Sequence, residues 1–201
     1  MITIIDYGMG NLRSVEKAFA FLGHEVAVSH DPASLGKARN IVLPGVGAFG
    51  DAMQELHARE LTGPLRKAIA AGVPFLGICL GYQLLFESSE ESPGVEGLGI
   101  LPGRVVRFPD RVKVPHMGWN DARFERSHAV LEGVETGSFF YFVHSYYVEP
   151  AEARDVLAVT SYGLDFASGA ARDNLVAFQF HPEKSSTAGM RILDGFARMS
   201  T

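Results

Sequence analysis

The chain has 201 residues, 47% of them hydrophobic, and a formal net charge of −5. These values predict one folded domain, residues 1–201, with a sizeable core, and they argue against a nucleic-acid binder, which usually presents a basic face. A single cysteine excludes an internal disulfide and a cysteine-based zinc site, and it fits a reducing cytoplasm. The start is not signal-like and no apolar run has bilayer length, so we expect a cytoplasmic protein without a membrane role.

The first ninety residues alternate predicted strands and helices. Apolar, β-branched runs that end at glycine or proline predict strands at 2–6, 24–30, 40–44 and 74–79. Amphipathic stretches predict helices at 11–23, 48–58, 61–72 and 80–91. Asn11 suits the start of the first helix and Gly23 its end. This alternation predicts a parallel sheet with helices on both faces.

The second half is rich in predicted strands. We expect them at 104–108, 111–115, 139–148, 155–163 and 174–180, and a closing helix at 184–200. The chain therefore predicts a doubly wound α/β fold of the flavodoxin-like kind. Its central sheet is expected to be mostly parallel, with an added antiparallel section.

The only cysteine, Cys79, ends a predicted strand in the stretch PFLGICLGYQLLF, with Gly77 and Gly81 two residues away on either side. Reactive groups gather at the carboxyl ends of parallel strands, and G-x-C-x-G there is similar to a nucleophile elbow. The start of the next helix would favour the thiolate, and the amide of Leu80 would face a developing oxyanion. The alternative is a buried structural cysteine, since free cysteine is often buried.

A base for this thiol is expected among the seven histidines. His181 stands out in LVAFQFHPEKS, because strand alternation would point His181 and Glu183 the same way, and a carboxylate orients an imidazole. The alternative is a surface His-Pro-Glu turn. The glycine-rich stretch PGVGAFG, residues 44–50, offers backbone N–H groups for an oxyanion, or is simply a turn.

Together, the glycine-rich loop, G-I-C-L-G-Y-Q and H-P-E resemble class I (triad) glutamine amidotransferase domains over the whole chain. The stretches IDYGMGNLRS, LPGVGAFG, VPHMGWN, YFVHSYY and FQFHPEKS are similar to the branch of that family that supplies glutaminase subunits to histidine biosynthesis. Branches that serve pyridoxal phosphate or anthranilate synthesis carry different loops and lack VPHMGWN.

The resemblance implies a role for each matching residue. Cys79 would attack the carboxamide of glutamine, His181 would move the protons, and Glu183 would orient His181. Oxyanion donors would be the amides of Gly47 and Leu80. The glutamine-binding residues that the resemblance implies are Gln83, Glu91, Ser145 and Tyr146.

The resemblance also implies a partner, a separate (β/α)8-barrel cyclase subunit that forms a heterodimer with this chain. The cyclase would use the ammonia to make imidazole glycerol phosphate and aminoimidazole carboxamide ribotide. The residues expected at this interface are Asn11, Met117, Trp119, Tyr141 and Lys184. Strand alternation places Phe140 and Phe142 in the core instead. No cofactor, metal, nucleic acid or membrane is expected.

Three other functions compete with this interpretation. A dinucleotide or flavin binder would use Gly8 and Gly10, but Arg13 stands where the fingerprint needs a third glycine. Another cysteine-dependent amide hydrolase on the same fold would carry the same triad. A regulatory subunit with an idle triad is the third. An absorbance scan for flavin or a nicotinamide titration tests the first, and turnover of glutamine compared with other amides and esters tests the second. The intact set of Cys79, His181 and Glu183 argues against the third.

Overall fold

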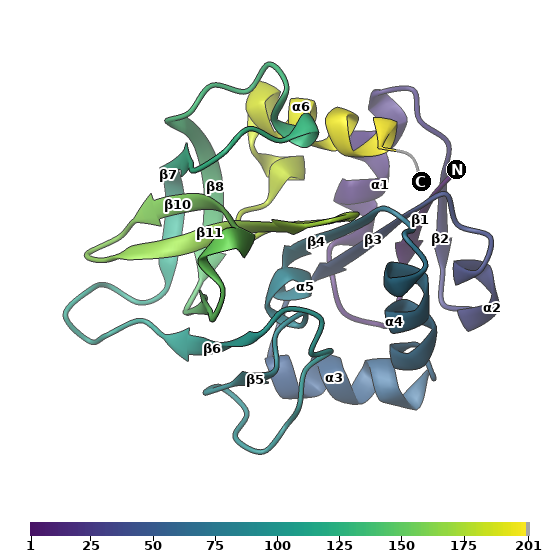
Figure 1. Cartoon of the computed structure of the whole chain (residues 1–201), viewed down its shortest axis with the longest axis horizontal. Coiled ribbons are helices and arrows are strands. Elements are labelled where there is room, and N and C mark those ends of the chain that lie inside the picture. The colour runs from purple at the N-terminus through teal and green to yellow at the C-terminus, as the bar shows by residue number, and fades with distance from the viewer. Residues whose placement is uncertain (200–201) are drawn as a thin grey trace.

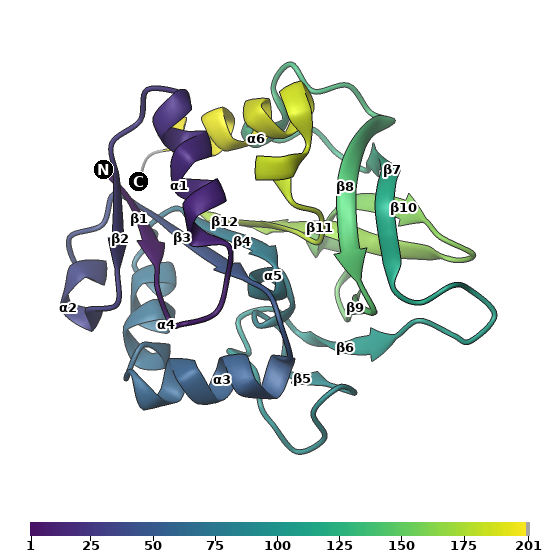
Figure 2. The same ribbon diagram turned by 180° about the vertical axis from the view of Figure 1, so that it is seen from behind.

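The computed structural model describes residues 1–199, which fold around a twelve-stranded sheet (Figure 1). Helices α1 (Leu12–Phe21) and α6 (Ser186–Arg198) cover one face, and α3 (Phe49–Ala58) and α4 (Thr62–Ala70) cover the other (Figure 2). Two helices are single turns, α2 (Pro32–Leu35) and α5 (Leu80–Gln83). Within residues 1–199, no helix is both long and apolar enough to cross a membrane.

One half of the sheet is parallel and the other antiparallel. The parallel strands are, in order across the sheet, β2 (Val26–Ser29), β1 (Ile2–Ile5), β3 (Asn40–Gly45), β4 (Phe75–Cys79) and β12 (Leu175–Phe178). The antiparallel strands continue as β11 (Asp165–Arg172), β10 (Val156–Ser161), β7 (His116–Phe124) and β8 (Ser138–His144). Off this path lie β5 (Ser88–Ser89), β6 (Gly103–Arg107) and β9 (Tyr146–Pro150). The predicted fold class is confirmed.

The parallel strands are buried on both faces, as sheets covered by helices on each side must be. In β3, the side chains of Ile41 and Leu43 belong to the core under α3 and α4. Val42, between them, belongs to the second core, under α1 and α6. The sequence of this strand is apolar almost throughout because its side chains enter both cores.

Strand register brings the three segments that hold the predicted site residues to one edge of the sheet. Gly45 at the end of β3 is the register partner of Cys79 at the end of β4. On the other side of β4, Phe178 of β12 is the partner of Ile78. The glycine-rich loop, the cysteine and the segment that begins with His181 therefore leave the sheet side by side.

The helix predicted at 80–91 is wrong beyond its first turn. It ends at Gln83, and Ser88–Ser89 form a strand instead. The segment after α5 is bonded to a returning stretch of chain, since the amides of Leu98 and Gly99 donate to the carbonyls of Leu84 and Phe86. These carbonyls take partners from another segment, so the helix does not continue.

Two further predictions in the second half need correction. The strand predicted at 111–115 is a turn and bends, and the strand of this region is β7, which starts one residue after Pro115. The strand predicted at 139–148 is two strands, β8 and β9, because the chain bends at Ser145. Strand β8 pairs with β7, whereas β9 pairs with β6 and β11. Strand β11 was not predicted.

Candidate active site

Cys79 occupies a sharp turn between β4 and α5. Its backbone angles are φ 55° and ψ −109°, a conformation that L-residues rarely adopt and that fits the strained turn expected for a nucleophile. Gly81 is required for this turn, because a Cβ there would lie 1.8 Å from the carbonyl oxygen of Leu43. At Gly77 a Cβ would lie 2.9 Å from the carbonyl oxygen of Gly81. Gly77 and Gly81 therefore allow the turn to pack tightly on itself and against β3.

His181 and Glu183 form a buried pair beside this turn. Nδ1 of His181 lies 2.8 Å from Oε1 of Glu183, and their side chains are 3% and 1% exposed. The surface-turn alternative does not fit this burial. The expected cause, strand alternation, is wrong: β12 ends at Phe178, and the two residues are brought together by a 3-10 turn, Pro182–Lys184. The hydroxyl of Ser185 anchors this turn by donating to the carbonyl of His181.

The charges around His181 favour its protonated form. Burial alone would lower the pKa of this imidazole, but the negative charge of Cys79, together with Glu183, outweighs burial and raises the pKa to about 10. Nδ1 is bonded to Glu183, whereas the buried Nε2 has no fixed hydrogen-bond partner. Nε2 is therefore the nitrogen left to exchange a proton in a reaction.

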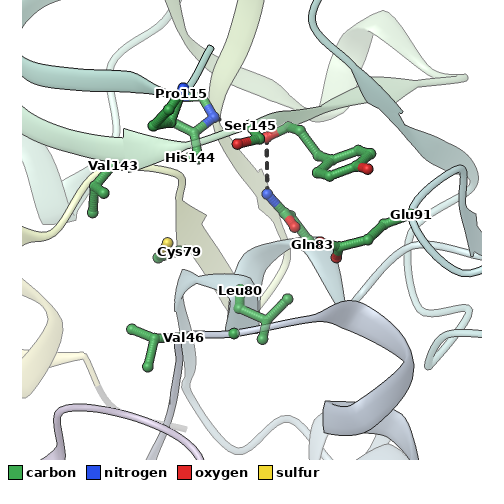
Figure 3. A pocket seen from close by; sticks show the side chains of 11 residues that line it. Val46, Cys79, Leu80, Gln83, Glu91, Pro115, Val143, His144 and Ser145 are labelled. Carbon is green, nitrogen blue, oxygen red and sulfur yellow. Dashed lines mark hydrogen bonds between the residues drawn. The ribbon is translucent and has the colours of Figure 1, made fainter.

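A pocket of about 380 Å³ opens over Cys79 (Figure 3). It is lined by the turn at Cys79, the glycine-rich loop and the bend between β8 and β9. All six residues predicted for oxyanion stabilisation and glutamine binding line it, namely Gly47, Leu80, Gln83, Glu91, Ser145 and Tyr146. The structure thus brings them together around the thiol, and their roles stay predictions.

The side-chain amide of Gln83 is held on one side of the pocket. Its Nε2 donates to the carbonyl oxygen of Tyr146 at 3.0 Å and to Oε1 of Gln179 at 3.0 Å. Both hydrogens of that nitrogen are used, so the amide orientation is fixed and its Oε1 remains to accept from a ligand. A donor such as the ammonium of an amino acid suits that oxygen.

Glu91 has a structural contact as well as a place in the pocket. Its Oε2 accepts from the backbone N–H of Phe49, the first residue of α3, at 2.8 Å. A carboxylate at a helix start satisfies an unpaired N–H and offsets the helix dipole. Its second oxygen can still reach a ligand in the pocket.

The glycine-rich loop has the backbone freedom that an oxyanion donor needs. Gly47 has a φ of +102°, and a Cβ there would lie 2.7 Å from Cε of Met9. Leu80 follows Cys79 directly, and both Gly47 and Leu80 line the same pocket as Cys79. The donor role of each amide stays a prediction.

Sequence reasoning missed two buried polar groups near the thiol. Gln179 is fully buried, and its Nε2 donates to Sγ of Cys79 at 3.8 Å, while its Oε1 accepts from Gln83. The hydroxyl of Tyr7 is buried without a partner, and burial, followed by the charge of Cys79, raises its pKa. An amide inside the apolar run VAFQF was the signal for Gln179.

Four of the five predicted interface residues gather on the outer face of β7 and β8 and the turn beside it. Met117 and Trp119 are 66% and 53% exposed. The rings of Trp119 and Tyr141 lie 6.3 Å apart, and Nζ of Lys184 is 5.8 Å from the Tyr141 ring. Asn11 is exposed at the start of α1, a helix that contacts the 182–184 turn.

The inner face of the same two strands is core, as predicted. Phe140 and Phe142 are fully buried. Across residues 1–199, no three histidine, cysteine, aspartate or glutamate side chains lie close enough to hold a metal ion.

Residues 3–199 match the family described as Glutamine amidotransferase class-I. The chain belongs to this family. It is 52% identical over 198 residues to "Imidazole glycerol phosphate synthase subunit HisH" of Moorella thermoacetica, covering 98% of this chain and 94% of that protein. It is 53% identical over 196 residues to the protein of the same name from Aquifex aeolicus, covering 97% and 95%.

Solved structures share the fold at low sequence identity. A crystal structure described as a glutamine amidotransferase has a TM-score of 0.78 at 19% identity, covering 99% of this chain and 100% of that one. PurLQS from Thermotoga maritima also has a TM-score of 0.78 at 19% identity, with 97% and 96% covered. At this identity the likeness concerns the fold alone.

Proposed function

We propose that this chain is the glutaminase subunit of imidazole glycerol phosphate synthase in histidine biosynthesis. It hydrolyses glutamine to glutamate and ammonia through Cys79, His181 and Glu183, and it passes the ammonia to a (β/α)8-barrel cyclase subunit. The observation that carries the proposal is the strained turn at Cys79, which lines a pocket of about 380 Å³ and lies beside the buried His181–Glu183 pair. The relatives named above, about half identical over nearly their whole length, support the choice of synthase.

The charges of the site suit an acyl transfer. The Cys79 thiolate attacks the carboxamide carbon of glutamine and forms a tetrahedral intermediate. His181, which holds its proton at neutral pH, gives that proton to the departing amino group, and ammonia leaves. His181 then takes a proton from water as the water oxygen attacks the thioester. Collapse of this second intermediate releases glutamate and the Cys79 thiolate, and the carboxyl proton passes to solvent. Glu183 fixes the ring through Nδ1 at both steps.

The negative oxygen of the intermediate needs two N–H donors. Leu80 supplies one directly after the nucleophile, and Gly47 in the glycine-rich loop supplies the other after the loop turns. One such donor is typically worth about 3 kcal/mol of transition-state stabilisation. If the loop directs the Gly47 N–H at the oxyanion only in the complex, glutamine is not hydrolysed when no acceptor for the ammonia is bound.

We predict that glutamate release depends on the partner. The isolated chain should turn over glutamine slowly, and the cyclase barrel with its nucleotide substrate should raise kcat by about 100-fold or more, because an oxyanion donor is completed. The measurement is glutamate release by the purified chain, alone and in the complex, with other amides and esters as comparison substrates. Absence of release from the wild-type complex overturns the proposal, and fast release by the isolated chain overturns the gating.

We predict that the exposed outer face of β7 and β8 binds the barrel. Replacing Trp119 with alanine should weaken the complex about 30-fold, since central aromatic side chains dominate protein interfaces. Phe21→Ala is the matched control, because Phe21 is 84% exposed at the far end of α1, away from this face. Titration calorimetry of each variant with the barrel measures the effect. Equal affinities for the two variants would place the interface elsewhere.

A further inference from the structure

Two buried histidines lie beside the pocket and take no part in the chemistry above. His116 begins β7 and His144 ends β8, and they are 3% and 6% exposed. They are register partners across the two strands, and Nδ1 of His116 lies 2.9 Å from Nε2 of His144. Buried polar pairs are costly unless every member is satisfied, so the partners of both rings matter.

The hydrogen bonds of this pair have only one possible direction. Nδ1 of His144 lies 2.8 Å from the carbonyl oxygen of Tyr146, which can only accept, so His144 carries its proton on Nδ1. Its bare Nε2 then accepts from Nδ1 of His116. The bare Nε2 of His116 in turn accepts from the amide nitrogen of Asn120 at 3.3 Å.

At the Asn120 end of this series of hydrogen bonds, the orientation of the side-chain amide is fixed by two other contacts. Its Nδ2 also donates to the carbonyl oxygen of Ser161 at 2.9 Å, and its Oδ1 accepts from the backbone N–H of Asp121 at 3.0 Å. This assigns the amide nitrogen and oxygen without reference to the histidines. Burial lowers the pKa of His116 to about 4 and that of His144 to about 3, so both rings are neutral at pH 7.

The other end of this series of hydrogen bonds, at the Tyr146 carbonyl, reaches the pocket. The Tyr146 carbonyl that accepts from His144 also accepts from Nε2 of Gln83 at 3.0 Å. Both lone pairs of that oxygen are therefore used, one by each partner. His144, Tyr146 and Gln83 all line the pocket over Cys79 (Figure 3). The orientation of the Gln83 amide thus depends on a carbonyl that His144 holds.

The His116 ring is clamped in place. It is stacked on Phe142, with ring centroids 4.7 Å apart, and on Tyr162, at 4.0 Å. On the opposite side of β7, the next residue along the strand, Met117, is exposed on the outer face to which we assign the partner. The strand therefore carries a rigid polar contact on one side and a docking residue on the other.

We propose that His116 and His144 are positioning residues, whose one-directional hydrogen bonds from Asn120 to the Tyr146 carbonyl hold the Gln83 side of the glutamine pocket. This inference rests on the proposed function for its substrate. The hydrogen bonds of the two rings go to each other, to Asn120 and to the Tyr146 carbonyl, and not to Cys79, His181 or Glu183. Their action is to keep the amide of Gln83 turned so that its oxygen faces the bound amino acid.

The first test determines directly which ring nitrogens of His116 and His144 carry protons. The 15N NMR spectrum of the labelled full-length chain at pH 7 should show His116 and His144 both neutral, each with its proton on Nδ1. A proton on Nε2 of either ring, or a charged ring, overturns the proposal. This measurement needs no glutamine turnover, so it stands whether or not the proposed function does.

The second test uses glutamine kinetics in the complex with the barrel. His116→Phe keeps an aromatic ring but removes the donor to His144, and KM for glutamine should rise about tenfold with kcat within about twofold. His116→Gln keeps one donor and one acceptor and should restore KM to within about threefold of wild type. Tyr162→Phe keeps the stack and all three hydrogen bonds of the pair and should leave KM unchanged.

The outcomes separate the two claims. A wild-type complex that releases no glutamate overturns the proposed function. An active wild type with an unchanged KM in His116→Phe overturns the positioning role. A fall in kcat shared equally by the phenylalanine and glutamine variants also overturns it, because that pattern indicates general damage to the fold. If His116→Phe does not fold, the NMR spectrum and the KM of His116→Gln decide.

Discussion

Replacing Cys79 with alanine should abolish glutamate release by the complex, with a loss of about 10,000-fold or more, because the attacking sulfur is gone. The same variant should lower the pKa of His181 from about 10 by on the order of two pH units, since the charge of Cys79 helps to hold that proton. Glutamate assays measure the first effect, and NMR titration of the His181 ring measures the second. A His181 pKa that stays near 10 in Cys79→Ala would mean that Glu183, without the charge of Cys79, is enough to raise it.

The raised pKa also predicts how stability depends on pH. The folded chain keeps the His181 proton up to about pH 10, whereas an unfolded histidine releases it near its ordinary pKa of 6.5. The proton therefore stabilises the fold fully below pH 6.5, and this contribution is lost as the pH rises through 10. By urea unfolding, the difference between wild type and Cys79→Ala should stay constant up to about pH 8 and shrink from there to about pH 10, because the variant's His181 contribution is lost by about pH 8. Cys79→Ser, with an uncharged hydroxyl, should behave like the alanine variant.

Replacing Gly81 with alanine should destabilise the fold by more than about 4 kcal/mol, enough to prevent recovery of folded protein. The new Cβ would lie 1.8 Å from the carbonyl oxygen of Leu43 and 2.9 Å from its carbonyl carbon, and backbone atoms of a central strand have no room to move.

Gly63→Ala is the matched control. Gly63 lies in α4, where an alanine Cβ would have no atom within 4 Å, so alanine there should leave stability unchanged or raise it by about 0.5–1 kcal/mol. Thermal and urea unfolding followed by circular dichroism compares the two variants. If Gly81→Ala unfolds at the wild-type midpoint, the turn at Cys79 is not closed against β3.

Much of this site could be predicted because its signals are local. The turn around Cys79 needs glycines two residues away on each side, and the sequence displays them. His181 and Glu183 are two residues apart, so one tight turn joins them, although the expected strand geometry was wrong. The apolar runs of β3 and β4 likewise predict strands that are buried on both faces.

Other features left little or no local signal. Strand β11, sequence DFASGAAR, is rich in alanine and glycine, which have low strand propensity, and it forms because β10 and β12 pair with it on either side. Gly169 is needed there for packing, since a Cβ would lie 2.8 Å from the Phe178 ring. The helix predicted at 80–91 stops at Gln83 because carbonyls of the next turn accept from residues 98 and 99.

The sequence by itself determined the α/β alternation, the tight turn at Cys79 and the His181–Glu183 pair, because each depends on residues within a few positions of one another. Only the tertiary structure decided that β12 lies beside β4, a hundred residues away in the chain, and that Gln83 donates to Gln179 and to the Tyr146 carbonyl that His144 also contacts. The physical reason is that strand pairing and buried hydrogen bonds are satisfied between distant segments. A local pattern of residues records that a polar group must be paired but not which distant group will pair with it.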